Sequence, residues 1–360
     1  MLRVDTPQQP FASRPAFTNF PTAGLVLFAL LATAPTRALA QQDLFDAEAP
    51  LALTLEAGLK PIFNDTRDDR EDRPARLWYR TETGDTVSFD LGVRTRGFFR
   101  RKYLDCDVPP LRLNFKKSQT PGTYFAGQDK LKLVTHCKDR NEAYEQYTLQ
   151  EYLLYKLFNQ LTDSSFRVRL VRMTYVDTRS KRRTATHYGF LIEDEDRIAE
   201  RLGGRRLESG VIHQEATDRA QATRLSVFQY MIGNTDWTMP THHNIKFVLA
   251  DPLQPPLAIP YDFDMAGLIN APYAAPDPQL GIRSVRERLF RGYCRTENEF
   301  DAVFADFNAQ REAIVALFRD FSLLEEKYRD RALDYLESFY ETINEPRSVK
   351  HEFLAVCLSR

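Results

Sequence analysis

Hydrophobic and polar residues alternate with a period of two from about residue 50 to Thr135. The clearest alternating runs fall at 77–79, 87–93, 111–115 and 131–133. Turn-forming residues separate these runs, as at Gly84 and at Pro109 and Pro110. Such alternation is typical of strands that bury one face. The pattern therefore predicts a meander of antiparallel strands.

A longer period replaces the alternation between residues 142 and 161. Four leucines recur there at every fourth position, namely Leu149, Leu153, Leu157 and Leu161. This spacing places them on one face of a helix, and it predicts that helix 142–161 packs against the sheet. The alternation then returns and predicts two further strands, at 168–176 and 186–192.

Helical patterns dominate the chain after Asp196. One predicted helix ends at Gly233, a residue suited to the left-handed position that follows a helix. Further helices are predicted at 284–290, 297–318 and 322–344. The chain is therefore expected to be of α+β class, with a strand-rich part at 50–196 that holds one helix and a mainly helical part at 197–360.

The N-terminal segment has the features of a secretory signal peptide. Arg3 and Arg14 precede an apolar run at 23–34, and Ala38-Leu-Ala40 follows it. We expect cleavage after Ala40, with a polar spacer at 41–49. The alternative is an uncleaved anchor, but the apolar run is well short of the roughly 20 residues that span a bilayer. The mature protein is thus expected to be secreted or periplasmic, without stable membrane insertion.

The net charge bears on nucleic-acid binding, and the cysteine content bears on disulfide formation. The formal net charge is −1, which argues against a dedicated nucleic-acid binder. The four cysteines are Cys106, Cys137, Cys294 and Cys357. An even number in an oxidising compartment favours disulfides, and Cys106 with Cys137 would join neighbouring predicted strands, leaving Cys294 with Cys357. A zinc site and free buried thiols remain as alternatives.

A predicted hairpin carries the most distinctive polar residues. Asn244 opens an alternating strand, a proline-rich turn follows at 251–256, and a second apolar run leads into Asp262. Antiparallel pairing about a midpoint near Leu253 would place Asn244 beside Asp262, with Asp236 in the preceding loop. Two carboxylates and an amide are what metal-assisted phosphoryl transfer requires, because this chemistry is mostly positioning and charge neutralisation. The alternative is that these residues cap turns.

Four short segments in this order resemble marker segments of the spore-coat CotH kinase family. They are Val-Arg-Thr-Arg-Gly at 93–97, Tyr-Gly-Phe-Leu-Ile-Glu at 188–193, Gly-Asn-Thr-Asp-Trp at 233–237 and Pro-Tyr-Asp-Phe-Asp at 260–264. The resemblance implies a two-lobed protein-kinase-like fold, with an antiparallel sheet lobe and a mainly helical lobe. It also implies phosphate transfer from ATP, with Mg²⁺ or Mn²⁺, to a Ser or Thr hydroxyl of an unknown protein substrate.

The same resemblance assigns roles around the hairpin. Asp236 would be the catalytic residue that orients or deprotonates the acceptor hydroxyl. Asn244 and Asp262 would hold the divalent cations, and Asp264 would be either a further ligand or a cap of the following segment.

Nucleotide contacts are implied for a second group of residues. Glu193 would lie beside the adenine, and Arg94 and Arg96 would lie near a turn over the phosphates. The phosphate-binding lysine is either Lys116 or Lys132, with Glu151 on the leucine-lined helix as the ion-pair partner, although Glu151 is also explained as a solvated helix charge.

The sequence departs from the family pattern in three places. Asn244 follows Asp236 by eight residues, whereas protein kinases use about five. Tyr261 stands where the family has Trp, and no Gly-rich loop is present. Two other functions therefore stay open: a metal-dependent hydrolase that uses His242 or His243, and a secreted binding module or pseudokinase without catalysis.

Overall fold

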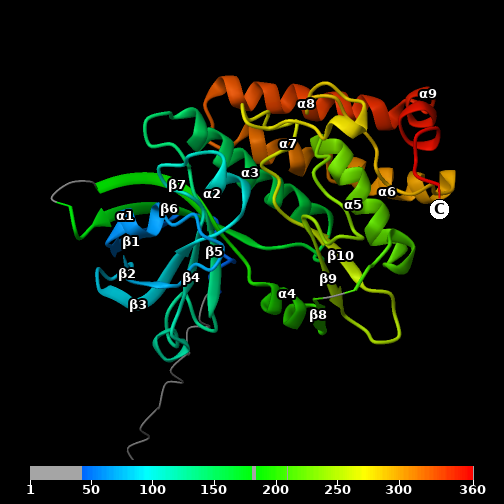
Figure 1. Ribbon diagram of the computed structural model, residues 1–360. Helices are drawn as coiled ribbons and strands as arrows, with labels where there is room; N and C mark the ends of the chain where they lie inside the picture. Colours follow the sequence, from blue (N-terminus) through cyan, green and yellow to red (C-terminus); the bar gives the residue numbers. More distant parts are fainter. Residues whose placement is uncertain (1–42, 181–183, 209, 360) are drawn as a thin grey trace, which may run out of the picture. The chain divides into compact units, whose positions relative to one another are not determined.

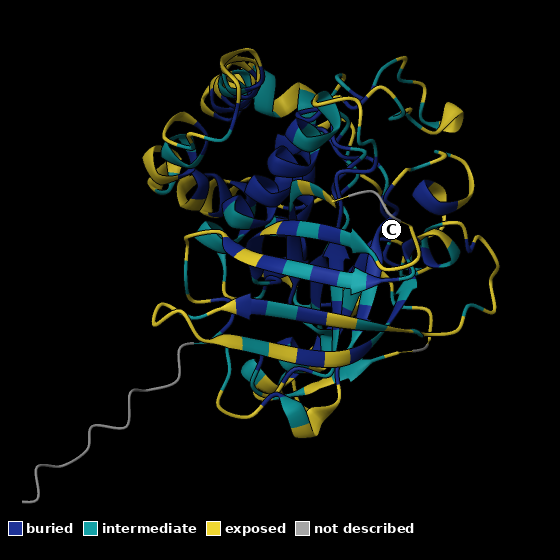
Figure 2. Ribbon diagram, turned by 90° about the vertical axis from the view of Figure 1, so that its left-hand side faces the viewer, coloured by how far each residue is buried: buried dark blue, intermediate teal, exposed yellow. Residues whose placement is uncertain are grey.

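Seven strands in the first half of the chain close into a barrel (Figure 1). The structure, a computed structural model, describes residues 43–180, 184–208 and 210–359. The barrel strands are β1 (Leu51–Ala57), β2 (Arg73–Arg80), β3 (Thr86–Thr95), β4 (Leu111–Asn114), β5 (Lys130–Val134), β6 (Val168–Asp177) and β7 (Thr184–Ile192). In β1 and β3 buried residues alternate with more exposed ones, as the sequence pattern predicts (Figure 2).

The closure of the barrel comes from one parallel pair of strands. β1 to β5 form the predicted antiparallel meander, and β5 then pairs with β7 and β7 with β6. β6 pairs with β1 in parallel, from Leu51 opposite Val171 to Ala57 opposite Asp177. The meander is thus confirmed, but the expected open antiparallel sheet is wrong. Alternation predicts strands and their local hairpins, whereas a pairing between segments far apart in sequence leaves no local signal.

Helix α3 (Ala143–Leu161) packs against β7 and β6, as its leucine spacing predicts. Leu149, Leu153 and Leu157 are buried. Figure 1 shows α3 running from the barrel toward the helices of the second half. α3 therefore connects the barrel to the rest of the chain.

A small second sheet holds the predicted hairpin. Its strands are β8 (Arg205–Leu207), β9 (Ile245–Leu249) and β10 (Leu257–Pro260), in the order β10-β9-β8. Ile245 pairs with Pro260, and the Tyr261 amide donates to the Asn244 carbonyl at 3.0 Å. Asn244 therefore lies opposite Tyr261, one residue away from the predicted pairing with Asp262. The hairpin is confirmed, and its register is shifted by one position.

Helices make up most of the remainder of the second half. The longer ones are α5 (Arg219–Ile232), α6 (Glu297–Ala309), α7 (Arg311–Arg319) and α8 (Glu326–Asn344). α5 ends at Gly233, whose φ of 66° is left-handed, as predicted. The predicted helix 297–318 is divided at Gln310, and the predicted helix 284–290 is wrong, because this segment forms turns.

Short helical segments complete the fold. They are α1 (Leu59–Phe63), α2 (Phe99–Lys102), α4 (Glu195–Arg201), α9 (Pro346–Val349), the 3₁₀ turns η1 (Lys117–Gln119), η2 (Gln214–Ala216) and η3 (Pro278–Leu280), and the π-helical η4 (Lys350–Leu354). The predicted division of the chain at Asp196 falls inside α4 and stays a prediction.

The hydrophobic core is shared across both halves of the sequence. One cluster fills the barrel and includes Leu55 and Phe89, and it also takes in Leu44 and Phe45 from the expected polar spacer. A second cluster joins α3 to the helices that follow the hairpin. Residues 41–360 accordingly form a single compact unit. The predicted two-lobed protein-kinase fold is therefore wrong: the protein has a closed mixed barrel, a separate three-stranded sheet and helices that share a core with α3.

Both predicted disulfides are confirmed, Cys106 with Cys137 and Cys294 with Cys357. Disulfides are typical of oxidising compartments. The predicted leader at 1–40 lies outside the described residues, and secretion stays a prediction. Within the part of the chain that the structure describes, every helix is too short or too polar to cross a bilayer.

Candidate functional site

A pocket of about 400 Å³ lies between the turn after β3, helix α3 and the foot of the hairpin. The residues that line it are Arg96, Gly97, Phe98, Phe99, Arg100, Pro110, Val134, Glu151, Asp236, His243, Asn244, Tyr261, Asp262, Asp264 and Met265. Segments that are far apart in sequence thus bring most of the predicted acidic and amide residues together.

Arg100 joins two buried carboxylates in this pocket. Its Nε donates to Asp264 Oδ2 at 2.8 Å, and its Nη2 donates to Glu151 Oε2 at 2.8 Å. Sequence reasoning missed Arg100. Its only signal was its position in an aromatic and basic run directly after Gly97, whose φ of 73° marks the turn out of β3.

Asp262 is the least compensated acid of the pocket. The backbone N–H of Asp262 donates to the Tyr155 hydroxyl at 2.8 Å. This hydrogen bond helps to hold Asp262 in a left-handed conformation, with a φ of 66°. Its carboxylate, by contrast, makes no hydrogen bond or ion pair with any described residue. Burial and the neighbouring Asp264 raise the pKa of Asp262 to about 6. Burial likewise raises the pKa of Glu151 to about 7, although Arg100 opposes this shift.

The pocket holds more acidic than basic side chains. Four carboxylates line it, those of Glu151, Asp236, Asp262 and Asp264, against the two guanidinium groups of Arg96 and Arg100. Asn244 Oδ1 is not engaged by any described residue. Carboxylate and amide oxygens are ligands that hard divalent cations prefer. The residues present therefore fit a Mg²⁺ or Mn²⁺ ion at Asp262, with Asn244 and Asp264 nearby.

Asp236 is held by two neighbours on the hairpin. The Asn244 side-chain amide donates to the Asp236 carbonyl at 2.8 Å and to its Oδ2 at 3.0 Å. His243 Nε2 lies 2.7 Å from Asp236 Oδ1, and this hydrogen bond raises the pKa of His243. His242 points elsewhere, and its ring packs edge-on against Phe247. The two adjacent histidines thus do not form a joint ligand set.

Arg96 reaches the pocket from the end of β3. Its Nε is buried and has no hydrogen-bond partner within residues 43–359 as far as they are described. A buried donor without a partner costs free energy unless an acceptor binds to it. Arg96 is therefore placed to bind an anion such as a phosphate. Arg94 instead contacts Asp72 at 3.4 Å and the Arg70 carbonyl at 2.9 Å, and it does not line the pocket.

The remaining predicted nucleotide contacts also lie elsewhere. Lys132 pairs with Glu195 at 2.7 Å, Lys116 is exposed, and Glu193 pairs with Arg201 at 2.9 Å. None of these three predicted residues lines the pocket. The partner of Glu151 is Arg100, in place of either lysine.

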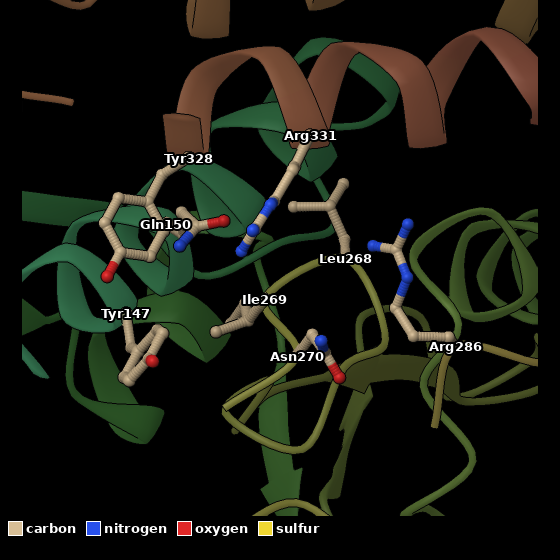
Figure 3. A pocket seen from close by; sticks show the side chains of 8 residues that line it. All are labelled: Tyr147, Gln150, Leu268, Ile269, Asn270, Arg286, Tyr328 and Arg331. Atoms are coloured by element: carbon tan, nitrogen blue, oxygen red, sulfur yellow. The ribbon is translucent and has the colours of Figure 1, made fainter. Parts of the chain in front are cut away.

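A second cavity of about 400 Å³ adjoins the first. Asp236, His243 and Met265 line both cavities, and the second also includes Trp237 and Arg291. A third, smaller cavity of about 240 Å³ lies between α3 and α8 (Figure 3). Two arginines, Arg286 and Arg331, extend toward it, and its lining includes no acidic side chain among the described residues. Of these three cavities the first has the most acidic side chains, and the second adds Asp277.

A scan against protein-family models finds no match for this chain, and a search of curated proteins finds no significant match. The resemblance to the CotH kinase family therefore stays a prediction.

Proposed function

We propose that the pocket binds a nucleoside triphosphate together with Mg²⁺ or Mn²⁺ and transfers a phosphoryl group to a hydroxyl of an acceptor. The observation that carries the proposal is the Asp262 carboxylate, which has no partner among the described residues in a pocket with an excess of acids. The proposal does not depend on the protein-kinase fold, which this chain lacks. Three of the four CotH-like segments contribute residues to the pocket, which also supports it.

The cation would be held by oxygen ligands of the hairpin. Asp262 supplies the charge, and Asn244 Oδ1 and Asp264 supply neutral and charged oxygens close to it. When bound, such a cation neutralises the charge of the phosphates. Arg100 keeps Glu151 and Asp264 in place through its two hydrogen bonds, so the acids keep their positions before the cation arrives.

The rest of the nucleotide would meet Arg96 and two aromatic rings. Arg96 offers its unpartnered Nε to a phosphate oxygen. Phe98 and Phe99 line the same pocket, and they are 57% and 38% exposed. Exposed aromatic faces at a charged pocket suit the stacking of a planar base.

Asp236 stands at the border with the second cavity, where an acceptor would lie. Both of its carboxylate oxygens are oriented, one by His243 and one by Asn244. A carboxylate in this position can accept a proton from, or orient, an acceptor hydroxyl. The second candidate function is a nucleotide-binding module without catalysis. It is favoured by the same two hydrogen bonds, because they engage both Asp236 carboxylate oxygens that would otherwise act on an acceptor.

Metal-dependent nucleotide binding is the first test. ATP with Mg²⁺ or Mn²⁺ should raise the melting temperature of the protein, since a ligand at about 100 times its Kd stabilises by about 2.7 kcal/mol. Asp262→Asn should abolish the shift, because the hard cation needs the carboxylate. Asp251→Asn is the matched control: it removes the same charge from the exposed turn of the same hairpin and should bind as wild type. An equal shift in EDTA would refute the proposal.

Asp236 separates transfer from binding. Asp236→Ala should still be stabilised by ATP with Mg²⁺ but should release no product, because a group acting on the acceptor is felt chiefly in the transition state. The acceptor used is water or a generic protein substrate, with ADP release as the readout. Wild type that binds ATP with metal but never forms ADP above the Asp236→Ala level would favour the binding module.

A further inference from the structure

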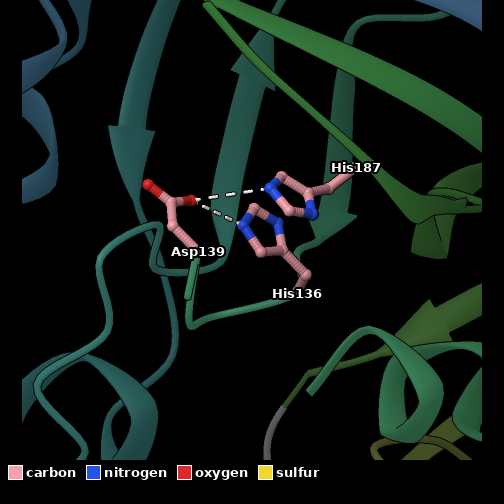
Figure 4. A group of neighbouring side chains, drawn as sticks. All are labelled: His136, Asp139 and His187. Carbon is pink, nitrogen blue, oxygen red and sulfur yellow. Dashed lines mark hydrogen bonds and ion pairs between the residues drawn. The ribbon is translucent and has the colours of Figure 1, made fainter. Parts of the chain in front are cut away.

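Two histidines and an aspartate meet beside the barrel, outside the pocket described above (Figure 4). His136 and Asp139 belong to the loop between β5 and α3, and His187 lies on β7. One nitrogen or oxygen from each of the three residues lies within 4.8 Å of the others. The fold thus brings together two imidazoles and a carboxylate that are distant in sequence.

Both histidines direct the same ring atom at the same carboxylate oxygen. Asp139 Oδ1 lies 2.8 Å from His136 Nε2 and 3.9 Å from His187 Nε2. Figure 4 shows both approaches converging on this oxygen. The second distance is too long for a hydrogen bond. At this distance a protonated His187 forms an ion pair with Asp139 and no hydrogen bond.

Glu145 of α3 holds His187 from its other side. Glu145 Oε2 lies 3.1 Å from His187 Nδ1, and it also accepts the Tyr188 backbone N–H at 2.8 Å. In a neutral imidazole, a carboxylate at one nitrogen fixes the proton there and leaves a lone pair on the other nitrogen. That lone pair of His187 then faces an oxygen of Asp139. Two such groups repel each other unless a proton or a metal ion lies between them.

The backbone around His136 is firmly anchored. Thr135 Oγ1 donates to the Val108 carbonyl at 2.7 Å, and the Val108 N–H donates to the Cys137 carbonyl at 3.0 Å. Cys137 is also joined to Cys106 by a disulfide. His136 itself is 1% exposed, and its Nδ1 has no hydrogen-bond partner among the described residues. Burial of an imidazole nitrogen without a hydrogen-bond partner costs free energy, and the anchored backbone keeps His136 in this position despite that cost.

We propose that His136, Asp139 and His187 bind one divalent transition-metal ion, of which Zn²⁺ is the representative, with Glu145 orienting His187. Zinc and neighbouring transition metals bind imidazole nitrogens, and zinc also takes a carboxylate oxygen as a ligand. Three protein ligands leave a further position for water. This site is independent of the proposed phosphoryl transfer, whose pocket offers oxygen ligands for a hard cation.

The first experiment uses the unmodified mature protein. After exhaustive chelation, titration with Zn²⁺ followed by elemental analysis should show one tightly bound ion per chain. X-ray absorption at the zinc edge should report two imidazole ligands. Absence of saturable Zn²⁺ binding, or a bound ion without histidine ligands, would overturn the proposal. So would an NMR spectrum in which added Zn²⁺ leaves the imidazole resonances of His136 and His187 unchanged.

Matched variants locate the ion. The His187 side chain is partly exposed, so the His187→Gln variant should fold. The variant should lose tight Zn²⁺ binding. Glu145→Gln should weaken the affinity about 10- to 100-fold, the usual effect of removing a group that orients a ligand. His351→Ala removes an exposed histidine, and Asp262→Asn removes the candidate Mg²⁺ ligand. Both should bind Zn²⁺ as wild type, and equal affinity of His187→Gln and wild type would overturn the assignment.

Discussion

Tyr261 contacts one group of charged side chains and lines the pocket that holds another, and the acids of the two groups have pKa shifts in opposite directions. In the first group, Glu195 is surrounded by cations: Lys132 at 2.7 Å, Arg206 at 3.1 Å and Lys246 at 3.3 Å. Both lysines also lie against the Tyr261 ring. Burial would raise the pKa of Glu195, but the lysine charges outweigh it and hold that pKa at about 2.

The second group lies in the candidate pocket, which Tyr261 also lines. Here burial prevails, and the pKa values of Asp262 and Glu151 rise to about 6 and about 7. The acids of one group have enough cationic partners, and those of the other do not. Carboxyl groups with strongly raised pKa values in a cavity are candidates for a functional site. The difference between the groups supports the proposal that the pocket, and not the ion network around Glu195, binds a cation.

Removal of Arg100 should produce the largest change in stability. Arg100→Met leaves Glu151 and Asp264 buried without their shared partner, and it should lower the free energy of unfolding by about 3 to 5 kcal/mol. The loss should be smaller in mildly acidic buffer, because protonation of the carboxyls removes their charge. Urea denaturation across pH measures both effects. A loss that is the same at every pH would mean that packing, not charge, explains the effect of Arg100.

Asp262→Asn should act in the opposite direction on the ligand-free protein. The folded pKa of Asp262, about 6, lies above its unfolded value of about 3.9, so the folded state binds more protons between these two values. Wild type should therefore lose stability as the pH rises through this window, and Asn at position 262 should not. The variant should be more stable than wild type by about 1 to 3 kcal/mol above this window and equal to it below. A variant that is less stable than wild type at neutral pH would contradict the unpaired state of Asp262.

Lys246→Met should have the smallest effect, because Lys132 and Arg206 remain to pair with Glu195. We expect a loss of about 0 to 1 kcal/mol, the range typical of partly exposed ion pairs. Urea denaturation under the conditions used for Arg100→Met allows the direct comparison. A loss as large as that of Arg100→Met would mean that the two groups do not differ in charge balance.

Local sequence patterns predicted much of the secondary structure, but they did not predict that the strands close into a barrel. The period of two located the meander, the leucine spacing located α3, and the alternating runs on both sides of a proline-rich turn located the hairpin. The turn did not fix the hairpin register, because one additional residue in a loop of this length shifts every pair by one position. The segment at 284–290 was predicted to be helical and forms turns, and its Phe290 packs into the core that α3 shares with the later helices.

The candidate site was partly visible in the sequence. Asp236, Asn244, Asp262 and Asp264 stand close together along the chain, and the structure gathers them with Glu151 and Arg96 around one cavity. Lys116, Lys132, Arg94 and Glu193 were assigned through a protein-kinase-like arrangement that this fold does not have, and they lie elsewhere. Arg100 carries no motif, and it became visible only through the two carboxylates it joins.

The sequence by itself predicted the strands, the long helix and the acidic hairpin, because each depends on residues that are close along the chain. It favoured the two disulfide pairs but left a zinc site and free thiols open. The tertiary structure decided the parallel pairing of β1 with β6, the balance of charges around Tyr261 and the meeting of His136, Asp139 and His187. These depend on contacts between distant segments, and the free energy of a buried charge is set by what surrounds it in space.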